Sequence, residues 1–159
     1  RERMADLSLE QLQAFIVHAK AATYIGDGPR CPSCRPGSHD LRYQEGAFTY
    51  LDSYFGGADF IGEEVVYHEG QPVWAMNYYG RLLHPSRIEA GGVGQVLRQS
   101  LSALYREGRF LGGWEYRAGD ATYVDTNEGN LTSFTGREWI LRGGVKAYEL
   151  IYHGGLIRE

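Results

Sequence analysis

One segment of this sequence gathers several side chains that suit an anionic ligand. The run DGPRCPSCRPGSHD at 27–40 holds Arg35, Ser38 and His39 among glycines and prolines, and Arg42 follows it closely. An arginine guanidinium donates paired hydrogen bonds that match carboxylate and phosphate groups. Because long loops on a rigid scaffold often carry function, we expect this segment to contribute to a ligand site.

The same segment contains the C-x-x-C pair Cys31 and Cys34, with His39 as a third candidate metal ligand. Structural zinc takes four protein ligands, and the second pair that usually completes such a site is absent from the sequence. The order of elements expected around the pair is also not that of a thioredoxin-like redox site. The pattern favours two reduced thiols without a metal, and zinc binding stays open as the alternative. No cofactor is predicted.

The sequence contains two similar stretches. YQEGAFTYLDSYFG at 43–56 and YRAGDATYVDTNEG at 116–129 share their tyrosines, an aspartate and glycines in the same order, and the match resumes after one inserted residue. This similarity predicts one domain, 1–159, made of two similar halves at about 8–80 and 90–155. The alternative is that two unrelated stretches share the turn and strand patterns of a β-meander. The matched positions include Tyr50/Tyr123, Asp52/Asp125, Gly62/Gly136, Glu64/Glu138 and Tyr78/Tyr152.

Each half is expected to hold one helix and four strands. Ser8 followed by Gln11 is a capping pattern that opens an apolar stripe from Leu9, and a second stripe runs from Val93 to Tyr105. The fold class is therefore α+β, with two tandem helix-plus-four-strand repeats forming a largely antiparallel, eight-stranded sheet and helices packed on one face. The strands are expected near 41–45, 47–54, 60–68, 72–79, 114–118, 120–126, 134–142 and 145–152.

Alternation along strand 72–79 separates a core face from a polar face. Trp74, Met76 and Tyr78 are expected in the core, which leaves Asn77 and Tyr79 on the opposite face. His153, the counterpart of Tyr79 in the second half, is expected on the same face. The amide, phenol and imidazole groups of these three residues suit contact with a ligand.

Four acidic residues recur in both halves. Asp52 and Asp125 are expected to accept backbone N–H groups near turns. Glu64 and Glu138 are expected on the solvent-facing side of the sheet, although a buried pair with shifted pKa values is the alternative.

The runs RPGSHDLRY, YLDSYFGGADFIGEEVVY and PVWAMNYYG resemble a bacterial family that is catalogued as a domain of unknown function. Some members of that family carry an N-terminal helix-turn-helix domain. The resemblance implies a ligand-sensing or interaction module, and it implies no reaction.

Charge and composition exclude several classes of partner. The net charge is −4 with a pI near 5.7, and no cationic cluster is present, which disfavours direct binding to nucleic acid. The sequence has no apolar run of transmembrane length, so no membrane contact is expected. Since no signal-peptide core is found either, we expect a cytoplasmic location. Arg1, Glu2 and Arg3 precede Met4, and the sequence leaves their origin open.

The leading hypothesis is a small-molecule-binding or sensing domain, with a pocket on the sheet closed by the 27–40 loop. Three arginines would contact anionic groups and two tyrosines would stack on a planar ring, and a nucleotide combines both features. Two alternatives remain: a hydrolase- or lyase-like enzyme, or a protein-interaction module that uses a tyrosine-rich face. The residues invoked are Arg35, Arg42, Arg81, Tyr54 and Tyr79 for the ligand, and Glu63 or Glu64 as base with His153 as acid for the enzyme.

Overall fold

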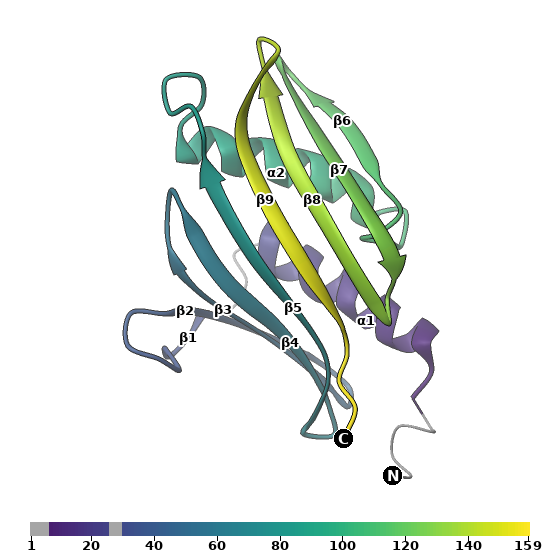
Figure 1. Ribbon diagram of the computed structural model, residues 1–159. Helices are drawn as coiled ribbons and strands as arrows, with labels where there is room; N and C mark the ends of the chain where they lie inside the picture. The colour runs from purple at the N-terminus through teal and green to yellow at the C-terminus, as the bar shows by residue number, and fades with distance from the viewer. Residues whose placement is uncertain (1–6, 26–29) are drawn as a thin grey trace.

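A computed structural model describes residues 7–25 and 30–159 and shows an α+β protein (Figure 1). Helix α1 spans Leu9–Lys20 and continues into one turn of π-helix, η1, at Ala21–Ile25, and helix α2 spans Ala90–Tyr105. The strands are β1 (Arg30–Cys31), β2 (His39–Glu45), β3 (Phe48–Gly56), β4 (Phe60–His68), β5 (Gln71–Leu82), β6 (Trp114–Ala118), β7 (Ala121–Asn130), β8 (Ser133–Arg142) and β9 (Val145–Leu156).

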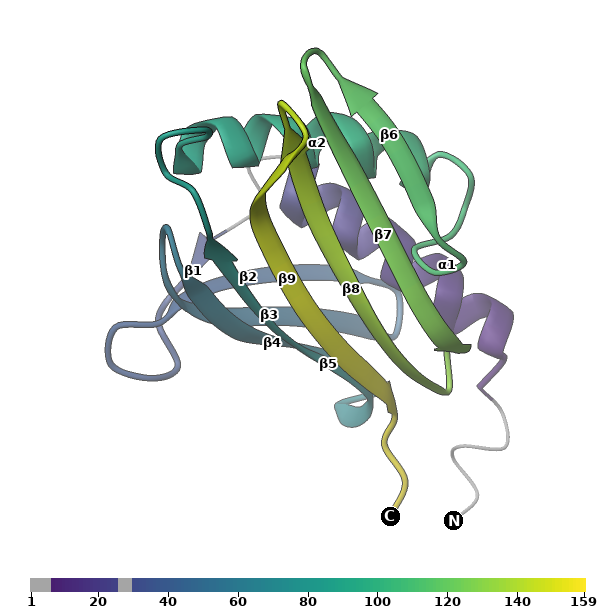
Figure 2. The same cartoon turned by 45° about the horizontal axis from the view of Figure 1, so that its top comes forward.

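All the described strands form one antiparallel sheet of nine strands in the order β1-β2-β3-β4-β5-β9-β8-β7-β6. The prediction of eight strands misses β1, a two-residue strand that pairs with β2 inside the predicted loop. Each half of the chain is a meander, and the halves join where β5 pairs with β9. Both helices lie on the same face of the curved sheet (Figures 1 and 2).

Local sequence explains where the helices begin and which side they bury. The Ser8 hydroxyl accepts a hydrogen bond from the backbone N–H of Gln11 at 3.3 Å, which confirms the predicted cap. Leu12 and Ile16 on the predicted stripe are fully buried, whereas Leu9 at its start is exposed. Among the described residues, no helix is both long enough and apolar enough to span a bilayer.

Period-two alternation sets the two faces of the sheet. Trp74, Met76 and Tyr78 are buried beneath the helices, as predicted, while Asn77 and Tyr79 are exposed on the side that we call the outer face. The helix-covered side, which we call the inner face, holds the aromatic core of the protein. Its largest fully buried side chains are Trp74, Tyr50, Tyr123 and Tyr148.

Candidate functional site

The predicted ligand-binding residues divide between the two faces of the sheet. Tyr54 is half-buried against the core on the inner face. The guanidinium carbon of Arg35 lies 5.2 Å from the centre of the Phe55 ring, and Phe55 points to the outer face because it follows Tyr54 in β3. Arg35, Asn77 and Tyr79 therefore share the outer face, but the sheet separates Tyr54 from Tyr79, so these two tyrosines cannot stack on one ring.

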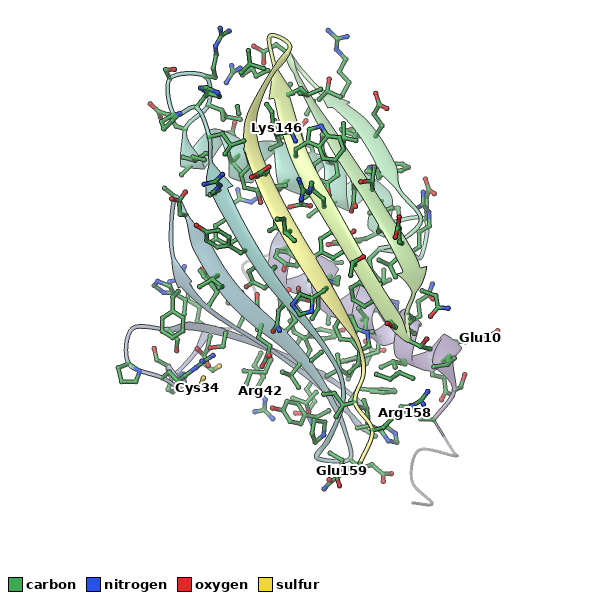
Figure 3. All side chains as sticks on the ribbon, viewed as in Figure 1. Glu10, Cys34, Arg42, Lys146, Arg158 and Glu159 are labelled. Atoms are coloured by element: carbon green, nitrogen blue, oxygen red, sulfur yellow. The ribbon has the colours of Figure 1, made fainter. Side chains whose placement is uncertain are left out.

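The other four predicted ligand residues also do not converge. Ser38 is buried and hydrogen-bonded within its own loop, and the His39 ring packs 5.1 Å from the ring of Tyr54. Arg42, labelled in Figure 3, is exposed at the β2 end of the sheet. Arg81 is exposed on β5, where its guanidinium lies 3.5 Å from a carboxylate oxygen of Glu149.

The catalytic candidates do not meet either. On the outer face Glu63 pairs with Asn77 and Asn77 pairs with His153, so one strand lies between the proposed base and acid. Glu64 is fully buried on the inner face, on the other side of the sheet from His153. The structure therefore assembles no acid–base pair from these three residues.

The two cysteines are free thiols at the β1 edge of the sheet. Cys31 lies in β1, and Cys34, labelled in Figure 3, has its sulfur 3.3 Å from the hydroxyl oxygen of Ser53. Residues 27–29 of the predicted loop lie outside the described part of the chain. Within residues 7–25 and 30–159, no group of three or more His, Cys, Asp or Glu side chains is arranged to hold a metal.

Four carboxyl groups instead lie inside the protein, between the sheet and the helices. Asp52 is opposite Glu64 on neighbouring strands, and Asp125 is opposite Glu138 in the same way. All four side chains are buried, so the prediction that the glutamates face solvent is wrong. Burial is tolerated because each carboxyl accepts hydrogen bonds from tyrosines on other strands.

Each aspartate is reached by a tyrosine that crosses a glycine. The Tyr78 hydroxyl donates to Asp52 at 2.6 Å, and its ring passes over Gly62 on the strand between them. A Cβ atom at Gly62 would lie 2.5 Å from the Tyr78 hydroxyl oxygen, so only glycine leaves space for this contact. Tyr152 donates to Asp125 across Gly136 in the same manner, also at 2.6 Å. Both aspartates lie within strands and bind tyrosine hydroxyls, which corrects their predicted role at turns.

We call Asp52, Glu64 and the side chains bonded to them the first cluster, and Asp125, Glu138 and the side chains bonded to them the second cluster. A lysine from α1 neutralises the first cluster. The Lys20 ammonium lies 2.9 and 3.1 Å from the two carboxylate oxygens of Glu64, and both side chains are almost fully buried. Tyr24 and Tyr50 donate to the same carboxylate at 2.8 and 2.6 Å. Since Glu64 accepts four hydrogen bonds, this ion pair is fully satisfied and has a structural role.

The second cluster is held by hydrogen-bond donors, and Lys20 lines the cavity beside it without forming an ion pair with it. Tyr123 donates a short hydrogen bond to Glu138, and Tyr148 donates to it at 3.2 Å. The side-chain amide of Asn127 donates a hydrogen bond to a carboxylate oxygen of Asp125 at 3.3 Å. Among the described residues, no Lys, Arg or His nitrogen comes within ion-pair distance of either carboxylate.

Burial changes the ionisation of these groups. Burial and the nearby Glu64 raise the pKa of Asp52 to about 8. Burial and Asp125 raise the pKa of Glu138 to about 7, and burial also raises the pKa of Asp125 itself. At neutral pH the interior therefore holds carboxyl groups that can give up or take a proton.

Pockets adjoin these carboxyl groups on the inner face. A pocket of about 320 Å³ lies between the sheet and α2, with Asp52 and Tyr54 on the sheet side and Leu97 and Leu101 on the helix side. A smaller cavity of about 80 Å³ shares Leu97 and Leu101 and is bounded by the second cluster. Towards the β1 edge, a polar pocket of about 400 Å³ shares Tyr54 and is lined by Ser38, His39, Arg30 and Arg98. Arg30, Arg98 and Asp40 line the pocket at the β1 edge, whereas the carboxyl groups of Asp52, Asp125 and Glu138 line the two inner ones.

Asp52 is the carboxyl best placed for contact with a ligand. One of its oxygens accepts the Tyr78 hydrogen bond, and no hydrogen bond to the other is found in the described part of the chain. The side chain is only 2% exposed and lines the 320 Å³ pocket. A protonated Asp52 can donate a hydrogen bond into this pocket, and an ionised one can accept a proton from a bound molecule.

Sequence analysis kept burial of Glu64 and Glu138 only as the alternative and did not place Asp52 and Asp125 with them, although the signal was present. Tyr50, Asp52, Glu64 and Tyr78 all recur in the second half, and their alternation places each on the face that also holds Trp74. Polar residues that alternation places on the same face as a core residue indicate a buried hydrogen-bond network.

Comparison with known proteins adds a family and no activity. The model of the family described as Domain of unknown function (DUF5680) matches residues 52–157, which include all four buried carboxyl residues but not Lys20, Tyr24 and Tyr50. No match is found among curated proteins, and none is found among solved structures. Since the matched region covers more than half of the sequence, the chain belongs to this family of unknown function.

Proposed function

We propose that this protein is a small-molecule-binding domain whose ligand lies between the sheet and α2 rather than on the outer face. The observation that carries the proposal is the 320 Å³ pocket, which has apolar walls and one buried carboxyl, Asp52, directed into it. Ligand pockets commonly combine a mainly apolar lining with a few placed polar groups. Interior carboxyl groups without a full set of partners are otherwise costly to keep, and a ligand would offset that cost.

A nucleotide is one class of ligand to test. Tyr54 has a half-buried ring beside the opening, and Arg30 and Arg98 supply positive charge there. In this proposal Arg30 and Arg98, which line the pockets, take the role that the sequence assigned to Arg35, Arg42 and Arg81. An adenine or guanine ring on Tyr54 with phosphates towards the arginines would combine stacking and charge.

A thermal-shift screen of nucleotides and metabolites tests the binding proposal. The test variant is Leu97→Trp, which places a large ring in the pocket and should remove the thermal shift given by a genuine ligand. Tyr79→Ala on the outer face is the control and should leave that thermal shift unchanged. A ligand whose shift survives Leu97→Trp and is lost in Tyr79→Ala would contradict an interior site.

An enzymatic role is a second candidate, and Asp52 supports it. A carboxyl group with a pKa near neutrality, oriented by Tyr78 and facing a pocket, suits general acid–base catalysis. Activity that is lost in Asp52→Asn while ligand binding persists would establish catalysis. Hydrolase or lyase chemistry would then use this residue rather than Glu63, Glu64 or His153.

The interaction-module alternative is supported by the outer face. Ile61, Tyr79 and Ile151 are exposed and lie side by side on β4, β5 and β9. Binding of a partner protein that is abolished by Tyr79→Ala, without an effect of Leu97→Trp, would favour it. Cytoplasmic location and a lack of direct contact with nucleic acid or membranes also remain proposals.

We also propose that the two halves are duplicated units. Tyr78 pairs with Tyr152 at the centre of the β5–β9 contact, and the flanking pairs Asn77–His153 and Tyr79–Ile151 are arranged evenly about it. Both halves run through their strands in the same order. Superposition of 43–80 on 116–154 tests this proposal, because unrelated meanders would not place the Asp, Glu and Tyr side chains on equivalent sites.

A further inference from the structure

Three apolar side chains lie exposed in one row on the outer face. Ile61, Tyr79 and Ile151 are register partners on β4, β5 and β9, and their exposed fractions are 55, 45 and 46%. Phe55 extends the row on β3, where the guanidinium of Arg35 lies over its ring. Both helices lie on the inner face, so neither covers this row (Figure 2). An exposed apolar surface of this kind commonly marks an interface.

Opposite charges border the row on its two sides. Glu63 follows Ile61 on β4, and Arg137 on β8 is the register partner of Ile151. Both charged side chains are exposed, and neither forms an ion pair within residues 7–25 and 30–159. Strands β5 and β9 lie between them, which is a separation of about 14 Å at the usual strand spacing. The two charges therefore cannot pair with each other within one chain.

The side of the outer face that carries Arg137 is hollowed. A depression of about 520 Å³ lies on β7, β8 and β9, and its lining includes Arg137, Ile151 and His153. On the other side of the row, the Tyr79 ring is exposed on β5. One side thus offers an aromatic ring and an acid, and the other side offers a hollow and a base.

We propose that the outer face binds a second copy of this chain, related by a two-fold axis that lies in the contact plane and runs parallel to β5 and β9 between them. This axis lays β5 over β9 of the second copy and β4 over its β8. Tyr79 then contacts Ile151 of the second copy beside the hollow, and Glu63 lies diagonally opposite Arg137 of the second copy. The inference goes beyond the proposed function, because it uses the face on which no interior ligand lies.

Complementarity within one surface favours a second copy over an unrelated protein. A two-fold contact brings the same patch of both copies together, so each group must find its counterpart in that patch. Here the ring and the acid on one side match the hollow and the base on the other, and the two-fold axis forms each match twice. Sheets pack face to face in this way in many proteins, with strand directions within about 30° of each other.

Sedimentation velocity over a concentration series of about 1–200 µM tests the inference. We expect the mass to rise from the 17.9 kDa of the monomer to twice that value. Tyr79→Ala and Ile151→Thr each remove an apolar contact at the centre and should weaken the dimer by at least about tenfold. Glu10→Arg is the control, because this exposed residue lies on helix α1, away from the outer face, and should leave the dimer unchanged (Figure 3).

Reversal of the two charges tests how the copies are oriented. Glu63→Arg and Arg137→Glu each place like charges opposite each other twice and should weaken the dimer several-fold at physiological salt. The double variant should recover most of the affinity, because each copy again meets an opposite charge. Within one chain these residues are farther apart than the screening length of about 8 Å, so such a recovery would report a contact between copies.

A protein that stays monomeric over the whole series would overturn the inference. A dimer that is insensitive to Tyr79→Ala and to both charge reversals would also overturn it, because its contact would lie elsewhere. Binding of a different protein to a monomeric chain, lost in Tyr79→Ala, would overturn the second copy as the occupant. Circular dichroism identifies the variants that are folded. Leu97→Trp, which blocks the inner pocket, should dimerise normally, so the inference and the proposed function fail independently.

Discussion

Tyr78 and Asp52 lie on strands that are not adjacent, and they meet through a 2.6 Å hydrogen bond that passes over Gly62. The contact joins β5 to β3 across β4 on the inner face, where the carboxyl lines the pocket. The same relationship joins Tyr152 to Asp125 over Gly136. The glycines therefore position the site even though they contribute no functional group.

Replacing Gly62 by alanine should separate Tyr78 from Asp52. The new methyl group would have to displace the Tyr78 ring, which is held by the core, so we expect a loss of about 1–3 kcal/mol in the free energy of unfolding. Urea denaturation measures this loss. Gly91→Ala is the control, because a methyl group there meets no neighbouring atom and should leave stability unchanged or slightly raised. Equal effects of the two substitutions would contradict the positioning role of Gly62.

Replacing Lys20 by methionine should leave Glu64 as an uncompensated charge in the core. Removal of one partner from a buried ion pair typically costs about 3–5 kcal/mol. The double variant Lys20→Met with Glu64→Gln should recover much of that loss, since it removes the charge as well. A double variant as unstable as the single one would show that Lys20 acts through packing instead.

The protein should become less stable as pH rises from about 5 to 8. In the unfolded chain carboxyl groups ionise near pH 4, whereas burial, with Glu64 and Asp125 as neighbours, raises the folded-state pKa of Asp52 to about 8 and of Glu138 to about 7. The folded state therefore binds more protons in this window, and its stability falls as pH rises through it, by an amount on the order of several kcal/mol.

Urea unfolding at pH 5.5 and pH 8.5 measures that dependence. Asp52→Asn and Glu138→Gln should each flatten it, because the replaced group can no longer ionise. Greater stability of the unmodified protein at pH 8.5 would reverse the sign and contradict the raised pKa values of these carboxyl groups.

Replacing both Cys31 and Cys34 by serine should change the free energy of unfolding by less than about 1 kcal/mol. Cys34 is exposed, and its sulfur lies 3.3 Å from the hydroxyl oxygen of Ser53 at the edge of the sheet. Elemental analysis checks the absence of a metal site. Stoichiometric zinc in the purified protein that is lost in the double variant would contradict the prediction.

Much of the fold follows from local patterns. The predicted strand near 60–68 has the observed bounds of β4, and the placement of Trp74, Met76 and Tyr78 in the core is confirmed. Turn glycines and alternation are properties of neighbouring residues, which is why they can be read from one sequence. The two-residue strand β1 was missed, since no local pattern distinguishes so short a pair from a loop.

The candidate site was less predictable because its partners come from distant elements. Glu64 appears in the sequence as one polar residue in a strand, and only the approach of Lys20 from α1 makes its burial possible. Likewise, Tyr54 and Tyr79 looked equivalent as aromatic residues of strands. Their opposite faces depend on the register of β3 against β5, which is set by the folded sheet.

Amide chemical-shift mapping by NMR tests the central claim, that ligands bind on the inner face, most directly. The probes would be a fragment library that includes AMP. We predict that the shifts cluster on residues that line the inner pockets, such as Asp52, Tyr54, Leu97 and Leu101. Shifts that cluster on Ile61, Tyr79 and Ile151, with none on α2, would place binding on the outer face and contradict the interior site.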